Sequence, residues 1–180
     1  MKPAVRNIVI FALVVLTCGF IGIAVDQALV PTSRMEGLGV LIWLIGPLAA
    51  SLLLRAFGGD GWRDFGLGLG HAPIWPAFLA AALIPLATTL VVLGLALGIG
   101  AVSAALPTGG FGTLLAVFGI AFAGSAVKNI FEEFAWRGYL TPRLDALQVQ
   151  PVVGWAVTGL IWASWHIPYY FYFLEPQVLA

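Results

Sequence analysis

The chain has 180 residues, of which 61% are hydrophobic and only 9% are charged. Water-soluble domains average about 45–50% apolar and about 25% charged residues. So few charges cannot cover a water-facing surface, and the chain is predicted to lie in a lipid bilayer. Its eight basic and eight acidic side chains balance and are scattered, which excludes a nucleic-acid partner. Cys18 is the only cysteine, which excludes an internal disulfide and a thiolate metal cage.

Apolar runs of membrane-spanning length alternate with short polar or glycine-rich joints. The first run is long enough to be a retained helix instead of a cleaved signal peptide. The sequence therefore predicts an all-α fold, a polytopic transmembrane helix bundle of about five membrane segments in one membrane-embedded domain over residues 1–180. In chain order the predicted segments are 8–25, 38–57, 73–99, 113–140 and 152–173.

The distribution of basic residues predicts the orientation in the membrane. With the N-terminus inside, only Arg34 falls on the outer side, whereas most of the other basic residues fall on the cytoplasmic side: Lys2, Arg6, Arg55, Arg63, Arg137 and Arg143. The positive-inside rule then favours a multi-pass protein of the cell membrane with a cytoplasmic N-terminus. The end of the fourth segment is predicted to approach the cytoplasmic face.

The fourth segment ends in a charged stretch, KNIFEEFAWRGYL, over residues 128–140. On a helix Lys128 and Glu132 are neighbours one turn apart, as are Glu133 and Arg137. A charge in mid-membrane costs about 2.5–3.5 kcal/mol on insertion scales. Two interpretations are open: the charges are solvated at the interface, or they are buried, with one carboxylate paired to Arg137 and the other free for general-base work.

His166 lies in an aromatic run, LIWASWHIPYYF, one segment after the two carboxylates. A lone histidine on such a helix is more often a packing residue, and His71, in a joint, is predicted to be at the surface. A Glu and a His from facing helices can, however, activate a water molecule or ligate a metal. The chain has neither the HExxH motif of zinc proteases nor the GxSxG motif of serine hydrolases. Ser125 and Ser164 have no Lys or Asp at a spacing that would indicate a serine mechanism.

These residues resemble the motifs of the CPBP family of membrane proteases, the CAAX-processing and bacteriocin-processing enzymes also called Abi or type II CAAX endopeptidases. The first family motif, EExxxR, is matched by Glu132, Glu133 and Arg137, and the glycine usual after the arginine is Gly138.

The second family motif, FxxxH, is matched by His166, with Trp162 in place of the phenylalanine. The stretch WRDFGL at residues 62–67 is similar to the linker that family members have before a long helix. Each motif is short, but their combination is specific, and the resemblance extends over most of the chain.

The resemblance implies an intramembrane endopeptidase that hydrolyses peptide bonds near the cytoplasmic face. Glu132 and His166 would activate the attacking water, and Glu133 and Arg137 would be a supporting pair. The implied substrate is a peptide or protein, either a prenylated CAAX tail or a bacteriocin-like peptide. Two mechanisms stay open: a metalloprotease with a divalent metal such as zinc, and a glutamate-type protease with no cofactor.

A third family motif, a His followed by Asn or Asp, has no match in this chain. The chain is therefore expected to be a fragment that lacks the C-terminal helices of the family, and not an inactive relative. An alternative from another class is a non-catalytic immunity or scaffold protein that binds a partner through the same polar pocket. A proton-relaying transporter is a weaker alternative, because no inverted repeat is visible.

Overall fold

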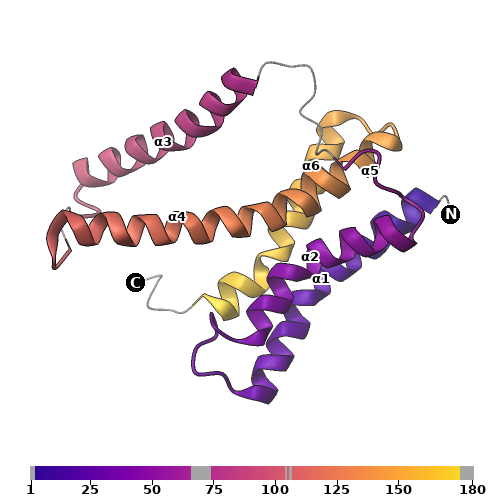
Figure 1. Ribbon diagram of the computed structural model, residues 1–180, viewed down its shortest axis with the longest axis horizontal. Coiled ribbons are helices and arrows are strands. Elements are labelled where there is room, and N and C mark those ends of the chain that lie inside the picture. Colours follow the sequence, from indigo (N-terminus) through magenta and orange to yellow (C-terminus); the bar gives the residue numbers. More distant parts are fainter. Residues whose placement is uncertain (1–2, 66–73, 104, 106, 175–180) are drawn as a thin grey trace. The chain divides into compact units, whose positions relative to one another are not determined.

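The computed structural model describes residues 3–65, 74–103, 105 and 107–174. Helices are the regular elements of this part of the chain, which confirms the all-α prediction (Figure 1). Two of them are five-residue π-helices, η1 and η2. The elements are α1 (Pro3–Leu29), α2 (Leu38–Phe57), α3 (Ile74–Gly98), α4 (Gly110–Ala135), η1 (Trp136–Leu140), α5 (Thr141–Ala146), α6 (Pro151–Trp165) and η2 (Tyr169–Phe173).

Within the described residues, four helical stretches are long and apolar enough to cross a membrane: Pro3–Leu29, Leu38–Phe57, Trp75–Gly98 and Gly110–Ala146. They confirm a polytopic membrane protein. The fifth predicted run is present as α6 and η2, with a break around His166. The 15 residues of α6 alone are fewer than the roughly 20 that a spanning helix needs.

Two of the predicted joints, which begin where the segments 8–25 and 113–140 end, are present but begin later than predicted: α1 continues through Asp26 to Leu29, and the chain stays helical through Pro142 to Ala146. Asp26 is buried in α1, where its Oδ1 accepts the backbone N–H of Gly39 at 2.8 Å near the start of α2. A helix start has backbone N–H groups without intrahelical partners, and this carboxylate satisfies one of them. Pro142 stands in the first turn of α5, which follows η1 directly, so the carbonyl of Gly138 lacks its helical donor.

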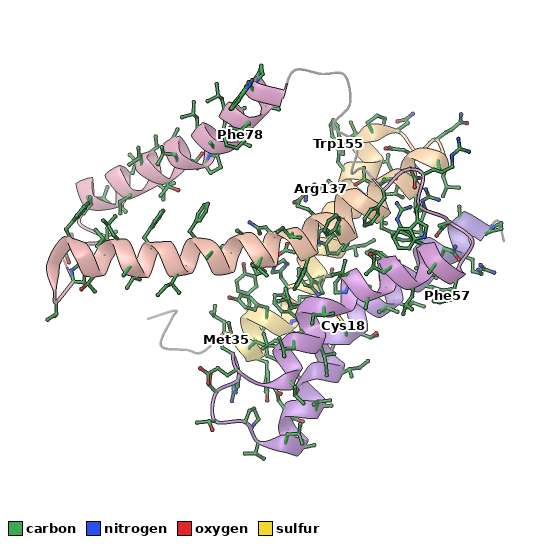
Figure 2. All side chains as sticks on the ribbon, viewed as in Figure 1. Cys18, Met35, Phe57, Phe78, Arg137 and Trp155 are labelled. Atoms are coloured by element: carbon green, nitrogen blue, oxygen red, sulfur yellow. The ribbon has the colours of Figure 1, made fainter. Side chains whose placement is uncertain are left out.

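The chain divides into two compact units, one of residues 1–66 and 125–180 and one of residues 67–124. The second unit contains α3 and the first part of α4, and Figure 2 shows side chains projecting around α3. Its large apolar side chains are exposed, as a lipid-facing surface requires. His71 and the end of the WRDFGL stretch lie outside the described residues, and the single domain stays a prediction.

The core of the first unit is the pair α1 and α2, which lie side by side (Figure 1). Gly22 and Gly39 mark the closest approach of the two helices: a Cβ on either residue would lie 2.3 Å from the carbonyl oxygen of the other. Small residues let membrane helices come this close. Cys18 is buried between the same helices, as an inert core residue would be (Figure 2).

A proline inside α2 connects this helix to α6. Pro47 has no N–H, so the carbonyl of Trp43, four residues earlier, loses its helical donor. The indole N–H of Trp165 donates to that carbonyl at 3.1 Å, and the indole N–H of Trp43 donates to the carbonyl of Trp165 at 2.8 Å. The two rings stack with centroids 4.4 Å apart. The end of α6, next to His166, is thereby attached to α2.

Charged and polar groups gather at one end of the first unit. The Asp60 carboxylate accepts hydrogen bonds from Asn7 Nδ2 at 3.0 Å, Tyr139 Oη at 2.7 Å and Arg143 Nη1 at 3.3 Å. The start of α1, the segment after α2 and the η1–α5 region therefore share one end, as the predicted topology requires. That this end faces the cytoplasm stays a prediction.

Candidate active site

Glu132 lies in the last turn of α4, with 7% of its surface exposed. Both carboxylate oxygens have donors. Lys128 Nζ donates to Oε1 at 2.6 Å from one helical turn earlier, and the indole Nε1 of Trp162 donates to Oε2 at 3.0 Å from α6. A buried charge needs such partners, because it is costly in apolar surroundings when unpaired. The spacing of Lys128 and Glu132 predicts the first contact.

His166 lies at the break between α6 and η2. Pro168 cannot donate to the carbonyl four residues earlier, so α6 ends at Trp165 and His166 becomes its C-cap residue. The Nδ1–H of His166 donates to the carbonyl of Trp162 at 2.9 Å. In a neutral imidazole this bond leaves the lone pair on Nε2, the nitrogen that can then act as a base or ligand.

Aromatic rings surround the imidazole. The ring centroids of Trp162, Trp165 and Trp43 lie 4.1, 4.6 and 5.8 Å from that of His166, which is 6% exposed. These contacts limit the orientations that the imidazole can adopt. The prediction that His166 belongs to a continuous spanning helix is wrong, and Pro168 is the sequence signal for the break.

Trp162 contacts both predicted catalytic residues. Its indole N–H reaches Glu132 on α4, while its carbonyl and its ring contact His166 one turn later on its own chain segment. The structure therefore brings Glu132 and His166 to one place through a shared neighbour. The only sequence signal for this role is the tryptophan at the phenylalanine position of the second motif.

Glu133 and Arg137 form the predicted ion pair, with Oε1 and Nη1 2.7 Å apart. Their side chains are 54% and 68% exposed, so the pair lies at the surface of the first unit and not in its interior. Each interpretation of the charged stretch therefore holds for one carboxylate: Glu133 is exposed with Arg137, whereas Glu132 is buried, although it pairs with Lys128 and is not free. Neither Glu133 nor Arg137 contacts Glu132 or His166 through a hydrogen bond within the described residues.

Arg55, at the end of α2, holds the π-helix that follows the carboxylates. Pro142 lacks an N–H, so the carbonyl of Gly138 has no donor four residues later. Arg55 supplies two donors instead, Nε at 3.2 Å and Nη2. Its Nη1 also donates to Asp64 at 2.7 Å, and Asp64 is bonded to Arg143 as well. The sequence patterns do not predict this role of Arg55; the only signal is the Gly138 to Pro142 spacing.

Glu132 and His166 are the two side chains of this site that could ligate a divalent metal. Catalytic zinc in proteins is held by three protein ligands. In the part of the chain that the structure describes, no three His, Cys, Asp or Glu side chains come together. The described residues therefore supply two of the three ligands that such a site needs.

Residues 114–180, which contain both motifs, match the family model of the Rce1-like proteins, described as type II CAAX prenyl endopeptidase Rce1-like. The matched segment is therefore similar to the CAAX proteases. This confirms the resemblance predicted from the sequence, and it points to a membrane-embedded protease that acts on a peptide or protein. No curated protein and no solved structure matches the chain.

Proposed function

We propose that this CAAX-family protein is an intramembrane endopeptidase whose general base is Glu132, assisted by His166. The observation that carries the proposal is that one residue of α6, Trp162, contacts two buried ionisable side chains, Glu132 at the end of α4 and His166 at the end of α6. Burial of a carboxylate and an imidazole against one tryptophan in an apolar chain is costly, and ionisable residues inside a membrane are candidates for a function. The family match over the same segment supports the reaction type.

The proposed reaction is hydrolysis of a peptide bond. Glu132 takes a proton from water, and the water oxygen forms a bond to the carbonyl carbon of the substrate. The C–N bond then breaks, and the proton passes from Glu132 to the departing amine nitrogen, so that a new carboxyl terminus and a free amine result. His166 Nε2 accepts a hydrogen bond from the water and orients it.

The contacts of Glu132 are compatible with its proposed role as a base. Each carboxylate oxygen has two lone pairs, and among the described residues each oxygen of Glu132 has one hydrogen-bond donor, so an oxygen can still accept a proton from water. Glu133 and Arg137 are proposed as the supporting pair. Their exposed position suits electrostatic contact with a substrate at the membrane surface more than burial against neighbouring helices.

The proposed substrate is a peptide with a prenylated CAAX tail, presented from the bilayer near the cytoplasmic face. The test uses full-length protein in proteoliposomes and two internally quenched probes, a farnesylated CAAX peptide and a bacteriocin-like peptide. We expect cleavage of the CAAX probe. Cleavage of the bacteriocin-like probe alone would support the proposed hydrolysis but contradict the proposed CAAX substrate. If neither probe is cleaved, the proposed function is overturned.

Two substitutions test the proposed catalytic groups. Glu132→Gln removes the base, and His166→Asn retains an N–H for the carbonyl of Trp162 but has no counterpart of Nε2. Each is expected to lower the rate at least about 100-fold, because general acid–base catalysis contributes roughly 10²–10⁴-fold. Glu36→Gln, at an exposed glutamate, is the matched control and should cleave normally. Undiminished cleavage by Glu132→Gln would contradict the assignment.

A further inference from the structure

The indole of Trp162 makes contacts that the ring of a phenylalanine could not make. Its Nε1–H donates to Glu132 Oε2 at 3.0 Å, while its aromatic ring contacts His166 with ring centroids 4.1 Å apart. A phenylalanine, which the second family motif has at this position, could supply the ring contact and the backbone carbonyl but has no donor for Glu132. The N–H is therefore a feature of this chain that the motif does not explain.

The hydrogen bond restricts the orientation of the Glu132 carboxylate. Lys128 holds Oε1 from a flexible side chain that is 41% exposed. Trp162 holds Oε2 from a rigid ring with only two rotatable bonds. With both oxygens bonded, the plane of the carboxylate is defined, and so are the directions of the lone pairs that remain free for water.

The same residue restricts His166. The carbonyl of Trp162 accepts the Nδ1–H at 2.9 Å, which selects the tautomer with a lone pair on Nε2. The indole ring lies at 52° to the imidazole ring and limits its rotation. A single rigid side chain and its own carbonyl thus orient both groups that the proposed function requires.

We infer that Trp162 is a positioning residue that aligns the Glu132 carboxylate with the His166 imidazole through its indole N–H, a role that rests on the proposed function. Preorganised geometry matters because a misplacement of about 1 Å can lower a rate by about 100-fold. Trp162 does not exchange a proton with the substrate, so its contribution lies in the rate of the chemical step and not in substrate binding.

The first test is Trp162→Phe, which keeps an aromatic ring and the backbone carbonyl and removes the N–H together with the five-membered ring. The full-length protein in proteoliposomes is assayed with the farnesylated CAAX probe, or with the bacteriocin-like probe if that one is cleaved. We expect kcat to fall roughly 10- to 100-fold, the range for loss of a hydrogen bond to a charged group, with KM unchanged. Trp155→Phe, two turns earlier on α6 at a position 70% exposed, is the matched control and should behave as the unaltered protein.

A second test does not depend on catalysis. Thermal unfolding is compared for the unaltered protein, Trp162→Phe, Glu132→Ala and the double variant. If the indole and the carboxylate are bonded, the two losses of stability are less than additive, because the second substitution removes a contact that is already absent.

The outcomes distinguish the proposed function from the positioning role of Trp162. Full cleavage by Glu132→Gln overturns the proposed function, whichever result Trp162→Phe gives. Unchanged kcat in Trp162→Phe, a rise in KM alone, or strictly additive losses of stability each overturn the positioning role. A lowered kcat with unchanged KM, together with less than additive losses, supports it.

Discussion

Replacement of Arg55 by Met removes the only side-chain donors that the carbonyl of Gly138 has within the described residues. Methionine has a similar length and keeps the apolar contacts of the arginine stem. The Arg55 side chain is fully buried, so water cannot replace the lost donors. A buried acceptor left without a partner costs about 1–3 kcal/mol. For a chain of this length that range corresponds to a fall in Tm of roughly 2–12 °C.

The same reasoning predicts a rescue by a second substitution. Pro142→Ala returns a backbone N–H four residues after Gly138, where a helical donor would normally be. We expect this substitution to be nearly neutral alone, because Arg55 already satisfies the carbonyl. In the Arg55→Met background it should recover most of the stability that was lost, giving a coupling of about 1–3 kcal/mol.

Thermal unfolding of the four proteins in detergent measures this coupling. Arg63→Met is the control, because Arg63 is exposed on the same loop and its loss should leave Tm nearly unchanged. If Pro142→Ala adds to the loss caused by Arg55→Met, or leaves it unaltered, the freed carbonyl is not the reason for the buried arginine. The destabilisation would then come from the other contacts of Arg55, the ion pair with Asp64 and the hydrogen bond to the carbonyl of Gly61.

Three further changes test other contacts by the same measurement of unfolding. Gly22→Ala forces α1 and α2 apart and should cost about 1–3 kcal/mol relative to Gly159→Ala, which meets nothing within 4 Å; equal stabilities would refute the close approach. Asp26→Ala removes the bond to α2 and should cost about 0.5–2 kcal/mol, whereas Asp26→Asn keeps an acceptor and should cost less. Glu133→Gln breaks an exposed ion pair and should change the free energy of unfolding by less than about 1 kcal/mol, so a larger loss would mean a buried role.

Part of the candidate site could be predicted from sequence because two of its ion pairs are local. Glu133 with Arg137 and Lys128 with Glu132 are pairs one helical turn apart, and the structure contains both ion pairs. Spacing along a helix is sufficient for such contacts, whatever the helix packs against.

Other features depend on contacts between distant segments. Glu132 and Glu133 are adjacent in sequence, but only Glu132 is buried and accepts a hydrogen bond from α6. Its bond to Trp162 joins residues 30 positions apart. The buried position of Asp26 likewise depends on a backbone N–H that belongs to the next helix.

The sequence by itself determined that this protein is a helical membrane protein and named the four polar residues of the candidate site, because apolar content and helical spacing are properties of the chain alone. The tertiary structure decided where the helices break and which side chains donate hydrogen bonds to the carbonyls that have lost a backbone donor. Pro47, Pro142 and Pro168 each leave a carbonyl without its helical donor. The sequence alone identifies that carbonyl, because it lies four residues before the proline. Which distant group supplies the missing donor, such as Arg55 for Gly138, follows only from the packed helices.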